Sequence, residues 1–482
     1  MNVPSLKTIV KNMSVLLVSD IIRYSFSFLF IMYIARYLGA EGFGLLSFVI
    51  ASMGILGVVA DLGMNSLMVR NVAVDRSLAG KYLGNVLLIK MILSLLIFIT
   101  LFTVIIVGSY PSETVWVVFF IGLSVILSVF TGVFTNVFQS FEKMQYLAIG
   151  DIVRSVLMLV GAFFIISLGE SVVVLASVYF YANLVVFVYS VFVVLWKFAR
   201  PRIEFDWRFW KKIFRDSLPM GGMAICFLIY FRVDTVMLAF MKGDVAVGLY
   251  NAAYRLTDAA MVIPALVMTV VFPVLSRYHE QGRGIFLQVY EKSFKFLLYG
   301  GLLMAVMVTL LSYPIIGVVY GDAFLESAGA LQILIWAAAA LFLSNVLGSV
   351  LVAANKQMFG LYINLATIFI NVFLNLCMIP FYGFIGAAIT TVVSEIINII
   401  ICMYYLEKHG YPIGLKAVFL PAFLGLGVIG GVIGVLSFVG ISSVVIALVS
   451  FVLYGMILFK FGLDKDDIML IRKIFTRDKH HM

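Results

Sequence analysis

Long apolar stretches, repeated along the whole chain, constrain its possible folds more than any other feature. A helix needs roughly 20 apolar residues to cross the hydrocarbon layer, and about fourteen such stretches follow one another between residues 13 and 459. Of the 482 residues, 63% are hydrophobic and only 12% are charged. A soluble protein of this composition would expose far too much apolar surface. The sequence therefore predicts an all-α, polytopic membrane protein.

Basic residues segregate to one side of the predicted membrane. With a cytoplasmic N-terminus, about four fifths of the 33 lysines and arginines fall on cytoplasmic segments, and we count Lys90 among them. Cytoplasmic loops of membrane proteins carry such an excess. The pattern predicts a multi-pass protein of the plasma (inner) membrane of a prokaryote, with both termini inside. It also accounts for the net charge of +9, so we expect no nucleic-acid partner.

The two halves of the chain resemble each other at a nearly constant offset. At about 204 residues, Gly39 and Gly44 correspond to Gly243 and Gly248. Farther along, at about 213 residues, the Glu142–Met144 turn corresponds to Asn355–Gln357. Each half contains roughly six spans, so the repeats share one orientation and a pseudo-two-fold axis along the membrane normal.

The duplication predicts how the chain divides into domains. The last two spans have no counterpart in the first half and form an appendix. We predict an N-lobe over residues 1–196, a cytoplasmic amphipathic linker over 197–216, a C-lobe over 217–410, two further spans over 411–460, and a cytoplasmic tail over 461–482.

The predicted linker has one apolar, aromatic face. Ile203, Trp207, Trp210 and Phe214 recur at helical spacing, and basic residues occupy the rest of the circumference. A basic amphipathic helix with tryptophan lies in the membrane interface. We expect this segment to be an anchored connection between the lobes, with specific lipid recognition as the alternative.

Ionisable residues interrupt several of the predicted spans. A charge at the centre of a bilayer costs about 2.5–3.5 kcal/mol even on a lenient scale, so it is kept where it faces protein or water. The residues are Asp20, Arg23, Asp61, Arg232, Asp234, Arg255 and Asp258. Asp20 with Arg23, and Arg255 with Asp258, are spaced to meet on one helix face. Each pair either locks helices as a neutralised pair or takes part in binding.

Catalytic motifs are missing from the sequence. The outer loops are short by hydropathy, with no phosphate-binding loop, no paired-carboxylate loop and no histidine cluster. We therefore expect no enzyme activity and no cofactor or metal. The intramembrane carboxylates could still couple transport to an H⁺ or Na⁺ gradient.

Several motifs resemble those of a known family. The resemblance covers nearly the whole chain and rests on these stretches: Ala35–Gly44, Asp61–Gly63, Arg70, Gly248–Arg255, Ala354–Lys356 and Pro380–Ala388. Together with the span count, they are similar to the polysaccharide-biosynthesis flippases, the O-antigen-type oligosaccharide translocases. That family belongs to the multidrug/oligosaccharidyl-lipid/polysaccharide exporter superfamily.

The resemblance implies a V-shaped transporter of two six-helix lobes that works by alternating access. Its cargo would be a polyprenyl-diphosphate-linked oligosaccharide, moved from the cytoplasmic to the outer leaflet. Cationic side chains in a polar cleft would meet the diphosphate. We expect the substrate ligands to be Arg23, Arg232 and Arg255, with Arg255 first because it lies in a family motif. The candidates for ion coupling are Asp20, Asp61 and Asp258.

Other functions and partners remain open from the sequence. One alternative is a cation-coupled drug or metabolite exporter of the same superfamily. A membrane-embedded glycan polymerase is disfavoured by the short outer loops. We expect a monomer that contacts membrane lipids and its lipid-linked substrate, with other glycan-assembly membrane proteins as further partners.

Overall fold

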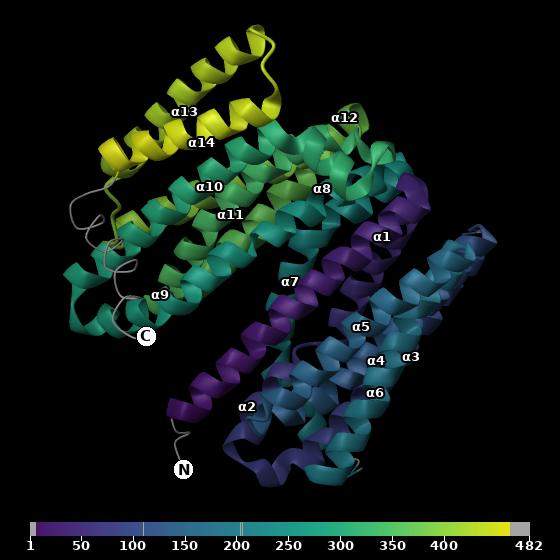
Figure 1. The fold of residues 1–482 in the computed structure, drawn as a ribbon. Helices are drawn as coiled ribbons and strands as arrows, with labels where there is room; N and C mark the ends of the chain where they lie inside the picture. The colour runs from purple at the N-terminus through teal and green to yellow at the C-terminus, as the bar shows by residue number, and fades with distance from the viewer. Residues whose placement is uncertain (1–5, 109, 203, 205, 463–482) are drawn as a thin grey trace, which may run out of the picture. The chain divides into compact units, whose positions relative to one another are not determined.

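The computed structural model describes residues 6–108, 110–202, 204 and 206–462, and every regular element in these ranges is a helix (Figure 1). The α-helices are α1 (Leu6–Asp61), α2 (Met64–Val74), α3 (Ala79–Val107), α4 (Ser112–Ser140), α5 (Met144–Leu168), α6 (Val172–Lys197), α7 (Trp207–Lys242), α8 (Asp244–Ala260), α9 (Val262–Gln281), α10 (Arg283–Tyr320), α11 (Ser327–Ala353), α12 (Gln357–Lys408), α13 (Leu415–Phe438) and α14 (Ser443–Ile457). Three short helical turns complete the set: η1 (Arg76–Leu78), η2 (Asp322–Phe324) and η3 (Leu458–Gly462).

The described residues contain 12 helices that are long and apolar enough to cross a membrane. Two of these helices contain a glycine with non-helical backbone: Gly39 in α1 (φ 66°, ψ −174°) and Gly383 in α12 (φ 55°, ψ −134°). The two halves of α12 run antiparallel, because residues at similar distances before and after Gly383 lie side by side. Asn371 Nδ2 donates to Ser394 Oγ at 3.2 Å, and Asn398 Nδ2 reaches Asn364 Oδ1 at 3.5 Å. Counting α1 and α12 as two spans each reproduces the predicted total of about fourteen.

The chain packs as two compact units that divide between Asn251 and Ala252. In unit 1, α4 packs along α6, and α1 packs along α5 and α7 (Figure 1). This division follows packing, and it falls inside α8. The boundaries predicted from the repeat, at 196 and 217, stay predictions; residues 463–482 of the predicted tail lie outside the described residues.

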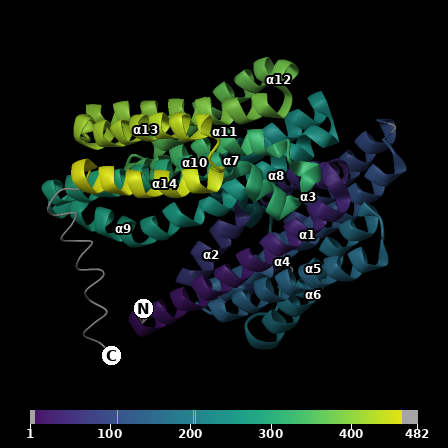
Figure 2. The same ribbon diagram turned by 45° about the horizontal axis from the view of Figure 1, so that its top comes forward.

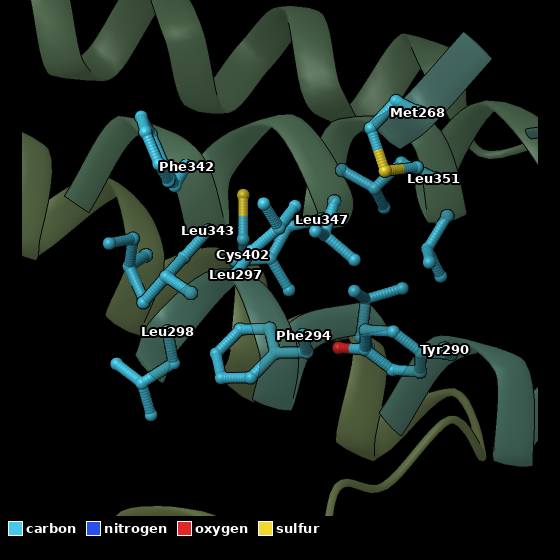
Figure 3. Packing of buried hydrophobic residues seen from close by; sticks show 14 of the residues in the cluster. Met268, Tyr290, Phe294, Leu297, Leu298, Phe342, Leu343, Leu347, Leu351 and Cys402 are labelled. Carbon is cyan, nitrogen blue, oxygen red and sulfur yellow. The ribbon is translucent and has the colours of Figure 1, made fainter. Parts of the chain in front are cut away.

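Unit 2 is built around α10, α11 and α12, and α13 lies beside α14 (Figure 2). Its core holds Phe294 and Leu297 of α10, Leu343 and Leu347 of α11, and Cys402 of α12 (Figure 3). These side chains are at most 5% exposed. A membrane helix has no apolar stripe to separate from water, so close side-chain packing of this kind determines which faces meet.

The backbone has matching turns at positions that correspond in the predicted repeats. Glu142 and Asn355, which correspond in the two repeats, both have a positive φ, at 59° and 57°. Such a conformation is uncommon for residues other than glycine. Gly39 and Gly243 also correspond, and both interrupt a helical path with a positive φ, of 66° and 80°, and a ψ of −174° and −177°. Matching turns at matching positions are the expected result of a repeated architecture.

Two corresponding glycines, Gly44 and Gly248, lie at a close contact between α1 and α8 within unit 1. A Cβ atom on Gly44 would lie 1.8 Å from the carbonyl oxygen of Asp244, and one on Gly248 would lie 1.9 Å from that of Ala40. No side chain fits at such distances, so helix backbones touch directly here. The contact is reciprocal, because Ala40 and Asp244 are themselves related by the repeat.

The amphipathic linker segment is not a separate interfacial helix. Residues from Trp207 onward form the first turns of α7, which continues through Pro219 to Lys242. Trp207 is exposed, whereas Trp210 is only 6% exposed and donates from Nε1 to Asn85 Oδ1 at 2.7 Å. The predicted interfacial position is therefore wrong for Trp210, because it is buried in a core cluster with residues of α2, α3, α4 and α6. Ile203 lies outside the described residues.

Candidate functional site

Four charged side chains gather where α1 and α5 pack together. Asp20 and Arg23 of α1 form an ion pair at 2.8 Å, and Asp151 and Arg154 of α5 form another at 2.8 Å. Both pairs have the same three-residue helical spacing, and Asp151 lies within electrostatic range of Arg23. The predicted contact between Asp20 and Arg23 is confirmed. We call these four residues the α1/α5 charge cluster.

Arg23 has hydrogen-bonding capacity left in this cluster. One of its Nη atoms donates to Asp20, and its guanidinium lies over the ring of Tyr24, 4.6 Å from the centroid. Its Nε is buried and has no hydrogen-bond partner among the described residues. The side chain is 34% exposed. A guanidinium carries five N–H donors, so Arg23 can accept an anionic ligand without leaving Asp20.

Asp61 is held by a partner that the sequence did not indicate. The Lys90 ammonium of α3 lies 2.7 Å from Asp61 Oδ1 and is fully buried, with 0% of its side chain exposed. Lys90 is thus an intramembrane residue, and its predicted cytoplasmic position is wrong. Its place inside the apolar run from 85 to 107 was the signal, since a loop lysine would precede such a run.

Arg232 and Asp234 occupy the middle of α7 in different environments. Asp234 is only 3% exposed and accepts from Tyr250 Oη at 3.0 Å, so it is buried in protein. The next residue, Thr235, approaches Asn251 in the same interface of α7 and α8. Arg232 is partly buried. Asp234 is therefore a packing group of the α7–α8 contact, and the role of Arg232 stays a prediction.

Arg255 and Asp258 belong to unit 2. Both lie on the part of α8 that follows Ala252, and both are partly buried. Arg255 lies within electrostatic range of Tyr320, the last residue of α10. Their predicted mutual contact and their roles in binding stay predictions.

A line of polar residues joins α11 to the two halves of α12. Ser344 of α11 donates to Glu395, and Asn371 reaches Ser394 across the α12 turn. Asn398 Nδ2 also reaches Asn364 Oδ1, at 3.5 Å. These side chains form hydrogen bonds that hold the helices together.

Loops that were predicted on the same side of the membrane meet in unit 1. Tyr37 Oη donates to the Glu170 carbonyl oxygen at 2.7 Å. Tyr37 follows the first predicted span and Glu170 precedes the sixth, so a cytoplasmic N-terminus places both outside. On the opposite side, the Arg202 N–H donates to the Gly80 carbonyl oxygen at 2.9 Å. This arrangement fits the alternation of the spans. Which side faces the cytoplasm stays a prediction.

The beginning of α7 is fixed by a charged cap outside the membrane spans. Asp206 accepts from the Phe209 N–H at 3.0 Å and from Lys81 Nζ at 3.1 Å. These hydrogen bonds, the backbone one first, hold the pKa of the Asp206 carboxyl below its usual range. Asp206 and Lys81 thereby tie α7 to the first turn of α3.

Comparisons with known proteins agree with this geometry. The model of the family described as polysaccharide biosynthesis protein matches residues 9–279, and the MatE model matches residues 219–377. The chain is 23% identical over 399 residues to a probable low-salt glycan biosynthesis flippase, Agl15, of Haloferax volcanii, covering 82% of each. It is also 23% identical over 397 residues to a putative O-antigen transporter of Shigella dysenteriae, covering 81% of this chain and 98% of the relative.

Solved structures of two transporters share the fold. The lipid II flippase MurJ, in an inward closed conformation, matches with a TM-score of 0.74 at 14% identity, over 92% of this chain and 98% of its own. An inward-facing multidrug resistance MATE family transporter matches with a TM-score of 0.65 at 16% identity, over 80% and 95%.

The chain is a polytopic membrane protein with the fold of the MurJ and MATE transporters and with charged residues inside its spans. Because the first family model spans more than half of the sequence, the chain belongs to the polysaccharide biosynthesis protein family. The family resemblance seen in the sequence is thus confirmed. The named relatives are flippases and transporters, not enzymes.

Proposed function

We propose that this protein is a flippase for a polyprenyl-diphosphate-linked oligosaccharide. It moves the headgroup from the cytoplasmic to the outer leaflet by alternating access, for the assembly of cell-surface polysaccharide or glycan. The names of the relatives, a glycan biosynthesis flippase and an O-antigen transporter, support this cargo. A sugar diphosphate cannot cross hydrocarbon unaided, whereas its lipid tail can stay in the bilayer.

The proposal rests mainly on the unused hydrogen-bond donors of Arg23 inside a candidate span. Arg23 is partly exposed and has a buried Nε without a partner among the described residues. Phosphate oxygens accept charge-assisted hydrogen bonds from the planar guanidinium fork. Asp20 holds the guanidinium in place without using all of its donors. Arg23 thus offers the α1/α5 charge cluster as a diphosphate site.

The remaining site residues enter the proposal by their chemistry. Arg232 and Arg255 provide further cations for the diphosphate. Asp20 and Asp258 are the carboxylates through which an H⁺ or Na⁺ gradient would act. Asp61 would take part only if its ion pair with Lys90 opened. We place the protein in the inner membrane with both termini inside, because this topology puts most lysines and arginines on cytoplasmic segments.

A binding measurement with Arg23 variants tests the proposed site. The purified full-length protein is titrated with a short-chain polyprenyl diphosphate sugar. Loss of a charged hydrogen bond costs roughly 1.5–3 kcal/mol, so Arg23→Ala should weaken binding about 10- to 100-fold. Arg23→Lys should restore binding only in part, because a point charge cannot reproduce the fork.

The control for this titration is Arg208→Ala, which removes an exposed arginine from the first turn of α7. It should leave affinity unchanged. Equal affinity of Arg23→Ala and the native protein would remove the α1/α5 charge cluster from the substrate path.

A cation-coupled drug or metabolite exporter is the second candidate function. The match of the MatE model to residues 219–377 favours it. Uptake of a lipophilic organic cation into inverted vesicles separates the two functions, because a diphosphate site has no affinity for a cation. Gradient-driven uptake of the cation, without binding of the lipid diphosphate, would select the exporter.

A further inference from the structure

Lys90 lies at the centre of a small oxygen cage in unit 1. Its Nζ atom is 2.7 Å from Asp61 Oδ1, 2.8 Å from Asn65 Oδ1 and 3.4 Å from the Val129 carbonyl oxygen. These three oxygens come from the end of α1, the start of α2 and the middle of α4. The lysine side chain reaches them from α3 and is 0% exposed.

The number of oxygens matches the charged form of the lysine. An ammonium group has three N–H donors and no acceptor. The cage offers it a carboxylate, an amide oxygen and a backbone carbonyl, all of which are acceptors. A buried charge is tolerated where it is paired and hydrogen-bonded in this way. Oxygen ligands of the same kinds are those that small hard cations take in proteins.

The amide that faces Lys90 is fixed by a second contact. Asn136 Nδ2 donates to Asn65 Oδ1 at 2.6 Å, which requires the amide oxygen of Asn65 to point toward both donors. Gly132 provides the room, because a Cβ atom there would lie 3.0 Å from Asn65 Nδ2. The orientation of Asn65 therefore does not depend on Lys90 alone.

The carboxylate of the cage is placed by a strained turn. Leu62 and Gly63, which follow Asp61, have φ values of 45° and 77°. A Cβ atom on Gly63 would lie 2.4 Å from the Gly221 nitrogen, so the turn is pressed onto the backbone of α7. The backbone at Asp61 is thus held by α7, so its position does not depend on Lys90 alone.

A cavity opens beside the cage. It has ≈ 30 Å³ for the centres of water molecules and is lined by Gly57, Ala60, Ser94 and Val129, among others. A single water needs about 10–15 Å³ by this measure. Ser94 lies one helical turn after Lys90, is 3% exposed, and its Oγ has no hydrogen-bond partner within the described ranges. The cavity therefore adjoins the cage at Val129 and one helical turn beyond Lys90.

We propose that the Lys90 ammonium is a tethered cation that fills a monovalent-cation site formed by Asp61, Asn65 and Val129. In the native protein, Asp61 then takes no metal ion, and a Na⁺ or K⁺ gradient acts elsewhere. When the tether is removed, the cage binds a free cation. The distances of 2.7 and 2.8 Å suit NH₄⁺ and K⁺ better than the smaller Na⁺. This inference does not depend on the proposed cargo.

Thermal unfolding of the purified full-length protein tests the site. Native protein and Lys90→Ala are compared in chlorides of NH₄⁺, K⁺, Na⁺ and N-methylglucamine at equal ionic strength. Lys90→Ala should have a lower midpoint, because it leaves Asp61 buried without its counter-charge. NH₄⁺ and K⁺ should raise that midpoint saturably, Na⁺ less, and N-methylglucamine not at all. The native midpoint should not distinguish these cations.

Two matched variants make the result specific. Lys90→Ala combined with Asp61→Asn should lose the cation response, and Lys211→Ala, at an exposed position on α7, should never have one. The same midpoint for Lys90→Ala in all four salts would overturn the proposal. So would a cation response that survives Asp61→Asn.

A second measurement covers the case in which Lys90→Ala does not fold. Native protein labelled with ¹⁵N at lysine Nζ should show an ammonium signal that is protected from solvent exchange and disappears in the Lys90→Met variant combined with Asp61→Asn, whereas a signal from Lys295, which is also buried, should remain. A neutral amine at this position would contradict the tethered cation.

Discussion

Several charged residues in the spans of this protein are held in close pairs. Asp20 with Arg23 and Asp151 with Arg154 are pairs within one helix, and Asp61 with Lys90 joins two helices. The pairs differ in exposure: Lys90 is fully buried, whereas about a third of the Arg23 side chain is open. Removing one partner of a buried pair leaves an uncompensated charge, so Lys90 acts mainly on stability and Arg23 on ligands.

Helical spacing predicted the pairs within helices but not the pair between them. The contact of Asp20 with Arg23 follows from their position on one helix face. Lys90 approaches Asp61 only because the α1–α2 turn brings the end of α1 against α3, and no local pattern encodes that packing. The interfacial position predicted for Trp210 was wrong for a related reason. Periodicity defines an apolar face but does not say whether lipid or protein covers it.

The two tryptophans at the start of α7 give a matched prediction at the level of single residues. Trp210→Phe removes the donor to the buried Asn85, so it should lower the free energy of unfolding by about 1–3 kcal/mol. Trp207→Phe, at a side chain that is 66% exposed, should be within about 0.5 kcal/mol of the native value. Thermal unfolding in detergent measures both. Equal losses would mean that the Asn85 contact does not hold α7 to α3.

At the level of elements, glycine turns and caps decide where the helices begin and end. Gly39 and Gly383 interrupt α1 and α12 inside the motif stretches Ala35–Gly44 and Pro380–Ala388, and so set limits between spans. Those limits were predictable, because glycine tolerates the required backbone. Asp206 is a local N-cap of α7 through the Phe209 N–H, whereas its contact with Lys81 of α3 was not predictable, because it joins segments far apart in the sequence.

The Asp206 cap predicts a pH-dependent stability. Its folded pKa is lowered, so its contribution is present above the unfolded value of about 3.9 and is lost as the pH falls through the lower folded value. Asp206→Asn keeps an acceptor for Phe209 but removes the charge beside Lys81. Its unfolding midpoint should be below the native one at neutral pH, and the difference should vanish under strong acid.

Lys81→Gln is the partner variant of that experiment. It removes the same interaction from the other side, so its pH profile should follow that of Asp206→Asn. A deficit of Asp206→Asn that stays constant down to acid pH would show that the charge has no part in it.

At the scale of the whole molecule, the chain is a duplication followed by two further spans, and corresponding segments of the repeats meet in a symmetric contact within unit 1. Gly44 and Gly248 approach the backbones at Asp244 and Ala40 in the same manner. Few identities in the sequence signalled the repeat, yet its offset placed these glycines in correspondence. The contact itself required the structure, because nothing in the alignment of one half with the other says that the corresponding segments touch.

The glycine contact predicts an effect opposite to the usual one. Alanine in place of a helical glycine normally stabilises by roughly 0.5–1 kcal/mol. Gly44→Ala should instead destabilise by about 1–3 kcal/mol or prevent folding, because its Cβ atom meets a carbonyl oxygen. Gly300→Ala on α10 meets no atom within 4 Å and serves as the control. A Gly44→Ala variant as stable as Gly300→Ala would contradict the backbone contact.

Leaflet transfer in reconstituted vesicles tests the central claim most directly. The purified protein is placed in liposomes with a fluorescent polyprenyl-diphosphate oligosaccharide, and the headgroup that reaches the opposite leaflet is quantified with a membrane-impermeant quencher or lectin. We expect transfer to depend on the native protein, to fall at least about 10-fold in Arg23→Ala, and to be unchanged in Arg208→Ala. Transfer no faster than in protein-free liposomes, with or without H⁺ and Na⁺ gradients, would contradict the assignment as a lipid-linked oligosaccharide flippase.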